Sequence, residues 1–363
     1  MALFSAKRSW IAVATLAVTA AAGAGVYFHY AGRRHTDNSE LSVYSVSPQQ
    51  TERTLDVLAE LPGNAPVVGY IDVEALRKLQ DSPVSKLLGL TRNSPPSQDR
   101  DYQRFVRETS FDYTRDLDRA AIAFWPASPG ATSKNPAPDN RGFAVADGRF
   151  DEKKIAAYAL KSGKSLVKGA RTIYVVEGNP PVAFEFLAPT RIALTSGTKS
   201  QEWLLDSHVK IDPSFRAQID RVARAPLFAV ARTEGLPNSF YANFNSSPQI
   251  ESLARSVKGF TLAAQPQGDV LKVALEGETT SAQNALAITT LLEISRMGAS
   301  MALSDPKTSA RMTNEQAAFL DILIRQLKLT QEGRSVFLHL DITPSMLGDV
   351  QSGSGRPPAN LSH

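Results

Sequence analysis

Residues 65–76 read APVVGYIDVEAL, and residues 225–236 read APLFAVARTEGL. In both segments an Ala-Pro pair leads a short apolar run, and a Glu and a Leu follow at matching places. Proline has no amide hydrogen to give to a sheet, so it fits the first residue of a strand. The two segments therefore predict the same strand-and-helix unit at two places in one chain.

The residues that follow each segment continue the resemblance between the two halves. Apolar runs bounded by turn residues predict strands, and acidic or serine-led segments with three-to-four spacing predict helices. The order strand, helix, strand, strand, helix occurs twice, which we interpret as a diverged tandem duplication. The predicted elements after the first segment are strands 120–126 and 142–150 and helix 151–160; after the second they are helix 247–257, strands 259–265 and 270–277, and a long helix from 281.

Each half also carries an extension of its own. Strands joined by short turns pair antiparallel, and helices then cover one face of each sheet. The predicted fold class is α+β, with two diverged repeats of strand-helix-strand-strand-helix forming antiparallel sheets covered by helices, preceded by one N-terminal transmembrane helix. The extensions are strands 172–177, 182–188 and 191–195 with helix 201–206 in the first half, and helix 315–327 with strand 335–342 in the second.

These assignments divide the chain into five parts. Polar, aperiodic sequence predicts a tether and a tail on either side of the globular part. The parts are an N-terminal transmembrane anchor at 1–32, a polar tether at 33–54, a first α+β repeat with its three-strand extension at 55–215, a second α+β repeat at 216–347 and a flexible tail at 348–363.

Residues 10–32 carry no Asp, Glu, Lys or Arg, and about 20 apolar residues are enough for a helix to cross a membrane. Aromatic residues at both ends are typical of a membrane interface, and basic residues flank the segment. The predicted anchor residues are Trp10, Leu16, Val26, Tyr27, Phe28, Tyr30, Arg33 and Arg34.

The short basic N-terminus with Lys7 and Arg8 favours a cytosolic start, which places the C-terminal domain outside the cytosol at the inner (cytoplasmic) membrane, as a periplasmic domain. Two alternatives stay open. The Ala-Ala-Ala at residues 20–22 is also a possible cleavage site, after which the protein would be secreted. Basic residues on both sides of the segment also allow the reverse orientation, with the domain facing the cytosol.

Composition excludes several chemistries. The 363 residues include no cysteine, which rules out disulfides, thiolate nucleophiles, cysteine zinc sites and a lipid-modified cysteine. A net charge of +4 is too small to indicate nucleic acid as a partner. The five histidines show no ligand spacing, and no nucleotide fingerprint is present, so we expect no metal and no cofactor. The Gly-Lys-Ser at residues 163–165 lacks the earlier glycine of a phosphate loop.

The acidic residues of FDYTRDLDR (residues 111–119) are the main catalytic candidates. Asp112, Asp116 and Asp118 alternate with arginines, which favours local ion pairs over a calcium site, because the central Gly and closing Glu of a calcium loop are absent. Glu74 is expected in the first turn of a helix. The alternative is an envelope hydrolase that uses Asp112, Asp116 and Glu74, and we assign no catalytic residue.

Several stretches resemble an uncharacterised family of membrane-anchored bacterial envelope proteins that is known as a domain of unknown function. They cover most of residues 55–347 and are fold-type rather than catalytic. The resemblance implies an envelope protein with an anchor and one globular part, and it carries over no site residue. The stretches are LPGNAPVVGYIDVEALRKL, FVRETSFDYTRDLDRAAIAF, GRFDEKKIAAYALKSG, ALEGETTSAQNALAI and RSVFLHLDITPSML.

We therefore expect a single-pass, extracytoplasmic protein that binds or scaffolds in the cell envelope without catalysis. Membrane lipid is its partner through the N-terminal helix. Clefts between domains are favoured ligand sites, so an envelope protein, a peptide or a lipid is expected at the seam between the two repeats. A deep apolar seam would favour a ligand, and a filled seam would favour scaffolding alone.

Overall fold

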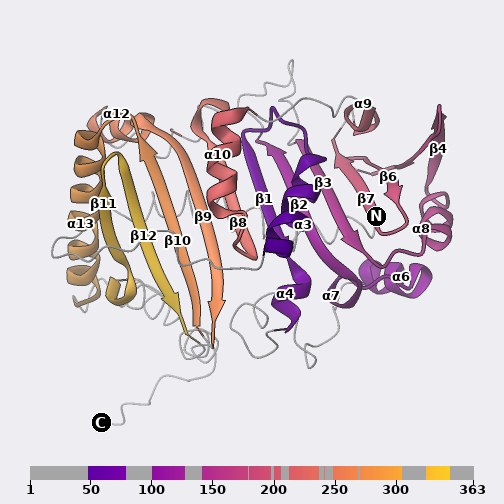
Figure 1. Ribbon diagram of the computed structural model, residues 1–363, viewed down its shortest axis with the longest axis horizontal. Helices are drawn as coiled ribbons and strands as arrows, with labels where there is room; N and C mark the ends of the chain where they lie inside the picture. Colours follow the sequence, from indigo (N-terminus) through magenta and orange to yellow (C-terminus); the bar gives the residue numbers. More distant parts are fainter. Residues whose placement is uncertain are drawn as a thin grey trace, which may run out of the picture.

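The computed structural model describes residues 48–78, 100–126, 141–178, 180–197, 200–205, 212–236, 241, 248–268, 270–304 and 324–343. Their twelve strands form one antiparallel sheet in the order β11-β12-β10-β9-β8-β1-β2-β3-β7-β6-β5-β4 (Figure 1). The strands are β1 (Val67–Asp72), β2 (Leu117–Trp125), β3 (Arg141–Gly148), β4 (Gly163–Lys168), β5 (Arg171–Val176), β6 (Val182–Ala188), β7 (Arg191–Ser196), β8 (Leu227–Arg232), β9 (Val257–Gln267), β10 (Val270–Thr279), β11 (Lys328–Glu332) and β12 (Ser335–Ile342).

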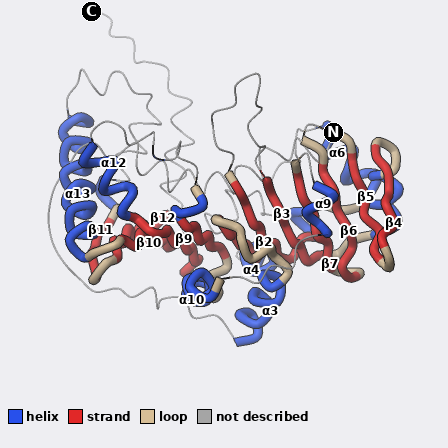
Figure 2. The backbone as a smooth tube through the Cα atoms, turned by 90° about the horizontal axis from the view of Figure 1, so that it is seen from above, coloured by secondary structure: helices blue, strands red, loops and turns tan. Residues whose placement is uncertain are grey.

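Helices cover parts of both faces of this sheet and one of its ends. Figure 2 shows α3 and α10 on one face, and α13 lies beside the β11 end. The helices are α3 (Pro48–Ala59), α4 (Val73–Lys78), α6 (Arg100–Thr109), α7 (Tyr113–Asp116), α8 (Glu152–Ala159), α9 (Ser200–Leu205), α10 (Pro213–Val222), the 3-10 helix η2 (Thr233–Gly235), α12 (Pro248–Ser256) and α13 (Ala282–Ser304).

The two Ala-Pro segments lie side by side at the centre of the sheet, as β1 and β8. Their backbones pair antiparallel from Val67 opposite Ala231 to Ile71 opposite Leu227. The carbonyl oxygens of the two prolines extend the pairing, because that of Pro66 accepts from the Arg232 amide and that of Pro226 accepts from the Asp72 amide, both at 2.7 Å. The prolines lack a donor, yet each contributes an acceptor where its strand enters the sheet.

The core has two layers, one on each face of the sheet. Side chains alternate between the faces of a strand, so Val68 and Tyr70 of β1 join one buried cluster and Ile71 joins the other. The first cluster includes Leu58 of α3 and Ile219 of α10, which explains why these helices dock on that face. The second cluster contains apolar residues of α4 and α8.

The predicted fold class is wrong in its assembly. We expected two repeats that form separate antiparallel sheets, whereas one continuous sheet runs through both halves, and β1 and β8 join them by backbone hydrogen bonds. One buried cluster also contains residues from both halves, including Val57 and Phe228. The alternation of apolar residues indicates which side chains are buried, but it does not indicate which strand edges pair.

Other differences concern the predicted boundaries. Helix α3 begins at Pro48, so the last residues of the expected tether (33–54) are helical, and Thr54 is buried. The transmembrane helix of the predicted fold class falls in residues 1–32, outside the described residues. Among the residues that are described, no helix combines the length and the apolar character needed to cross a membrane.

Candidate functional site

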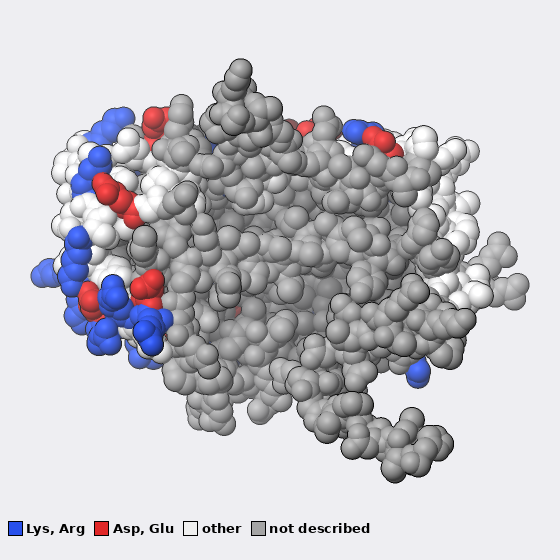
Figure 3. Space-filling view, turned by 180° about the vertical axis from the view of Figure 1, so that it is seen from behind, with Lys and Arg blue, Asp and Glu red and all other residues white. Residues whose placement is uncertain are grey.

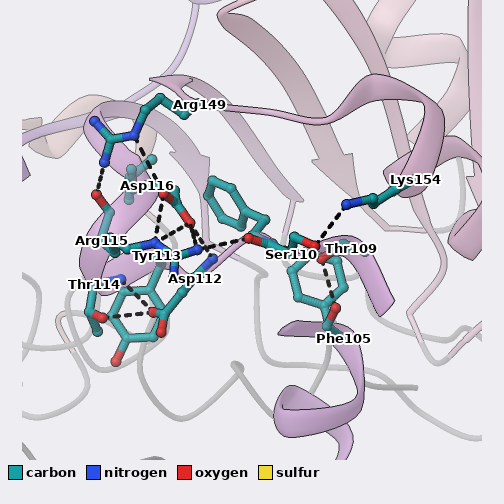
Figure 4. Close-up of polar contacts among 12 residues, drawn as sticks. Phe105, Thr109, Ser110, Asp112, Tyr113, Thr114, Arg115, Asp116, Arg149 and Lys154 are labelled. Carbon is teal, nitrogen blue, oxygen red and sulfur yellow. Dashed lines mark hydrogen bonds and ion pairs between the residues drawn. The ribbon is translucent and has the colours of Figure 1, made fainter. Parts of the chain in front are cut away.

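The loop between α6 and β2 holds most of the acidic residues that the sequence analysis singled out (Figure 4). One carboxylate oxygen of Asp112 accepts hydrogen bonds from the Thr114 amide (2.9 Å), the Thr114 hydroxyl (2.7 Å) and the Tyr102 hydroxyl (2.9 Å). Asp112 is thereby the N-cap of α7. Its geometry is that of a residue that fixes the loop.

Asp116 is buried against the same loop and is surrounded by donors. Its Oδ2 accepts from the Asp112 amide at 3.0 Å and from the Arg115 guanidinium at 2.6 Å, and its Oδ1 lies 3.4 Å from Arg149 Nε. Burial acts to raise the pKa of Asp116, but the hydrogen bonds from Arg115 and the Asp112 amide outweigh it and hold the pKa below its usual value.

Asp118, the third of these acidic residues, lies at the start of β2. Its Oδ1 lies 3.8 Å from Arg77 and 3.6 Å from Arg149. Arg77 also donates from Nε to the Thr114 carbonyl oxygen at 2.8 Å, which ties α4 to the loop. The predicted local ion pair is therefore confirmed for Asp116 with Arg115, whereas Asp118 pairs with arginines that are distant in the sequence.

Glu74 lies in the first turn of α4, as predicted. It accepts a hydrogen bond from Lys78 at 2.8 Å and lies 3.7 Å from Arg119, and the hydrogen bond from Lys78 lowers its pKa. A carboxylic acid that protonates a substrate at neutral pH needs a raised pKa. Asp116 and Glu74 are shifted in the opposite direction, so their environments match ion pairing rather than acid catalysis.

A second charged group crosses four strands, and the sequence analysis missed it. Asp72, Arg119, Asp147 and Arg191 stand directly opposite one another on β1, β2, β3 and β7, and their signs alternate along the row. We call these four residues the charged ladder. Each lies within three residues of an end of its strand, but the register that aligns the four is not visible in the sequence.

The charged ladder connects the sheet to α3. Arg191 Nε donates to Asp147 Oδ1 at 2.7 Å, and Arg191 Nη2 donates to Asp56 of α3 at 2.6 Å. The hydrogen bond to Asp147 is the main cause that raises the pKa of Arg191. Asp72 caps α4 through a 2.7 Å bond from the Ala75 amide. The ladder thus holds two helices against one row of the sheet.

The seam between the halves, where we expected a ligand, coincides with the pairing of β1 and β8. The rings of Tyr70 and Phe228 stack across it with centroids 5.2 Å apart, and both side chains are buried. Burial raises the pKa of Tyr70 well above its usual range. Hydrogen-bonded backbone and stacked rings fill the seam along this line.

The predicted anchor residues, from Trp10 to Arg34, lie outside the described residues. Within the described part of the chain, no group of three or more His, Asp or Glu side chains is placed to hold a metal ion. His339 lies on β12, opposite Ala274 of β10 and half-buried, and burial lowers its pKa.

A largely apolar stripe on α13 is exposed in the part of the chain that the structure describes. Leu286, Ile294, Met297 and Met301 are 49–71% exposed, and with the exposed Thr290 they follow one side of the helix in steps of three or four residues. We call these five residues the α13 stripe. Figure 3 shows mostly uncharged atoms at this end of the molecule, whereas Lys and Arg gather at the opposite end.

Comparisons with known proteins give only a remote likeness. No family model matches the chain, and no curated protein gives a significant match. Solved structures of the protein TP0453 are similar: crystal form I has 14% identity and a TM-score of 0.40 over 85% of this chain and 97% of that chain. Crystal form III has 12% identity and a TM-score of 0.41 over 85% and 98%. At these scores the likeness carries no argument about function.

Proposed function

We propose that this protein is a single-pass, membrane-anchored, extracytoplasmic protein that binds a partner protein in the cell envelope and performs no catalysis. The observation that carries the proposal is the α13 stripe. A contiguous exposed apolar patch on a globular protein is typical of a site that contacts another molecule. The uncharged segment 10–32 supports the membrane anchor, because its length suits one crossing.

The chemistry of the stripe favours a protein as its partner. Four large apolar side chains stand half-exposed or more along a helix of 23 residues. Such a row of side chains, spaced by three or four residues, is typical of a helix that binds in an apolar groove of a partner protein. The acidic residues of the alternative hydrolase lie in caps and ion pairs, so they add no support for catalysis.

Site-directed photo-crosslinking in intact cells tests the binding role. A photoreactive phenylalanine analogue replaces Thr290 or Met297 of the stripe, and a matched control replaces Ala217, which is exposed on α10. We expect a discrete protein adduct from the two α13 positions and none from position 217. Adducts of equal yield from all three positions, or adducts with lipid alone, would contradict the proposal.

A second experiment tests the placement outside the cytosol. Reporters that are active only outside the cytosol, or only inside it, are fused to the C-terminus of the full chain. We expect activity from the first reporter alone. Activity from the second alone would support the reversed orientation, and release of the fusion into the medium would support cleavage of the N-terminal segment.

A further inference from the structure

Among the described strands, β4 is an edge of the sheet and pairs with β5 alone. The two-residue turn at Gly169 and Ala170 fixes that pairing, since Gly169 has φ +65°. Every residue from Lys164 to Lys168 is exposed, and Val167 is 76% exposed. Alternate residues of an edge strand direct their amide and carbonyl groups away from the sheet. β4 therefore offers a preformed template for another strand.

The charges on β4 specify what kind of strand it would accept. Lys164, Leu166 and Lys168 lie on one face, because they stand opposite Val175, Ile173 and Arg171 of β5. Within the described part of the chain, no ion pair involves Lys164 or Lys168, whereas Lys161 just before the strand lies 2.5 Å from Glu108. Lys164 and Lys168, four residues apart, thus lie on either side of the apolar Leu166. Figure 3 shows further Lys and Arg side chains around this end of the molecule, with Asp and Glu side chains among them.

The same charges disfavour a second copy of this strand. An antiparallel self-pair centred on Leu166 would place Lys164 of one copy opposite Lys168 of the other, and like charges in opposed positions destabilise a sheet. Edge lysines also guard sheets against aggregation. That role alone does not explain why Leu166 and Val167 are left exposed between the lysines.

We infer that the free edge of β4 binds an extended acidic peptide segment of a partner protein by strand addition. The segment has two acidic residues four positions apart, opposite Lys164 and Lys168, with an apolar residue midway, opposite Leu166. Backbone hydrogen bonds supply the pairing, and the two ion pairs set the register. This surface is separate from the α13 stripe and does not depend on the function proposed above.

Binding of a synthetic peptide to the full chain in detergent micelles tests the inference. The probe is Ser-Glu-Thr-Val-Val-Glu-Ser with a fluorophore at one end, followed by fluorescence anisotropy. We expect saturable binding that the charge-reversed double variant K164E/K168E weakens by about tenfold or more, since two favourable cross-strand pairs become unfavourable. The same variant gains affinity for the peptide with Lys in place of both Glu residues.

Two controls distinguish strand addition from non-specific electrostatic attraction between the peptide and the protein. The double variant R107E/K153E changes the net charge equally on exposed residues of α6 and α8, and it retains binding. A peptide N-methylated at alternate residues keeps its charge but loses amide donors, and it binds at least about tenfold more weakly.

Equal losses in both double variants, or unchanged binding of the N-methylated peptide, would overturn the inference. Self-association of the wild type that K164E/K168E abolishes would overturn it in favour of a second copy.

Discussion

Asp147 of β3 and Arg191 of β7 occupy directly opposed positions in the sheet, and Arg191 Nε donates to Asp147 Oδ1 at 2.7 Å. Both side chains are largely withdrawn from solvent, at 16% and 17% exposed. The same guanidinium holds Asp56 of α3. One residue therefore completes the charged ladder and attaches a helix to the sheet.

Replacing Arg191 by Met should cost about 2–4 kcal/mol of unfolding free energy, because Asp147 then remains largely buried without its main partner. Urea denaturation followed by circular dichroism measures the loss. The matched control is Arg216→Met, which breaks the exposed Arg216–Asp220 pair within α10 and should cost less than about 1 kcal/mol. Similar losses in both variants would show that the ladder contributes no more than a surface pair.

The sequence predicted most strands to within a few residues, because apolar alternation and turn residues mark them. β5 to β7, for example, lie where they were expected. β4 escaped prediction because both of its faces are exposed and its sequence carries no apolar alternation. Helix α10 was missed as well, although its buried residues Phe215, Ile219 and Val222 follow the three-to-four spacing of a helix.

The assembly of the strands lay beyond the sequence. The edge of β1 that pairs with β8 depends on contacts between two buried strands that are far apart in the chain. The local sequence of either strand does not indicate this pairing. The ion pair of Asp116 with Arg115 was predictable, since the two residues are adjacent in the chain. The partners of Asp118 were not, because Arg77 and Arg149 are distant from it in the sequence. The charged ladder was not predictable, because its four members come from strands far apart in the chain.

Ser110 has φ +62° directly after α6, in the left-handed region that glycine adopts with least strain. Ser110→Gly should therefore stabilise the protein by up to about 1 kcal/mol, and Ser110→Val should destabilise it by about 1–2 kcal/mol. Thermal unfolding compares the variants. Ser162→Gly is the control, because Ser162 is absent from the positive-φ residues and should lose stability instead. A destabilised Ser110→Gly would show that the Lys154 hydrogen bond to the Ser110 hydroxyl matters more than the backbone strain.

The lowered pKa of Asp116 predicts a dependence of stability on acid. The carboxylate stabilises the fold fully above the usual pKa of aspartate, near 4, and this contribution is lost as the pH falls through the lower pKa of the folded state. Asp116→Asn should cost about 1–3 kcal/mol at pH 7 and much less at pH 2. Denaturant titrations across this range measure the difference. A constant difference from pH 7 to pH 2 would mean that the charge of Asp116 is not the source of its contribution.

His339 predicts a second loss of stability with falling pH, in a window closer to neutral. Burial lowers its pKa, and its buried Nε2 has no hydrogen-bond partner among the residues that the structure describes. At a pH well above about 6.5, the histidine is neutral in the folded and unfolded chain, so no penalty arises. As the pH falls below that value, the unfolded chain takes up the proton first, and stability decreases until the folded pKa is reached, with a slope of at most about 1.4 kcal/mol per pH unit.

The pKa of His339 also depends on its charged neighbours. Asp341 and Glu332 act to raise it, and Lys328 acts to lower it, so all three stay unchanged in the comparison. His339→Gln should remove the loss of stability between pH 6.5 and pH 5 that the wild type shows in denaturant titrations. His208→Gln, a change outside the described residues, should leave that loss in place. A wild-type stability that is flat over this interval, or a loss in His339→Gln as large as that of the wild type, would contradict the assignment, because the slope assigned to His339 requires its proton affinity to fall on folding.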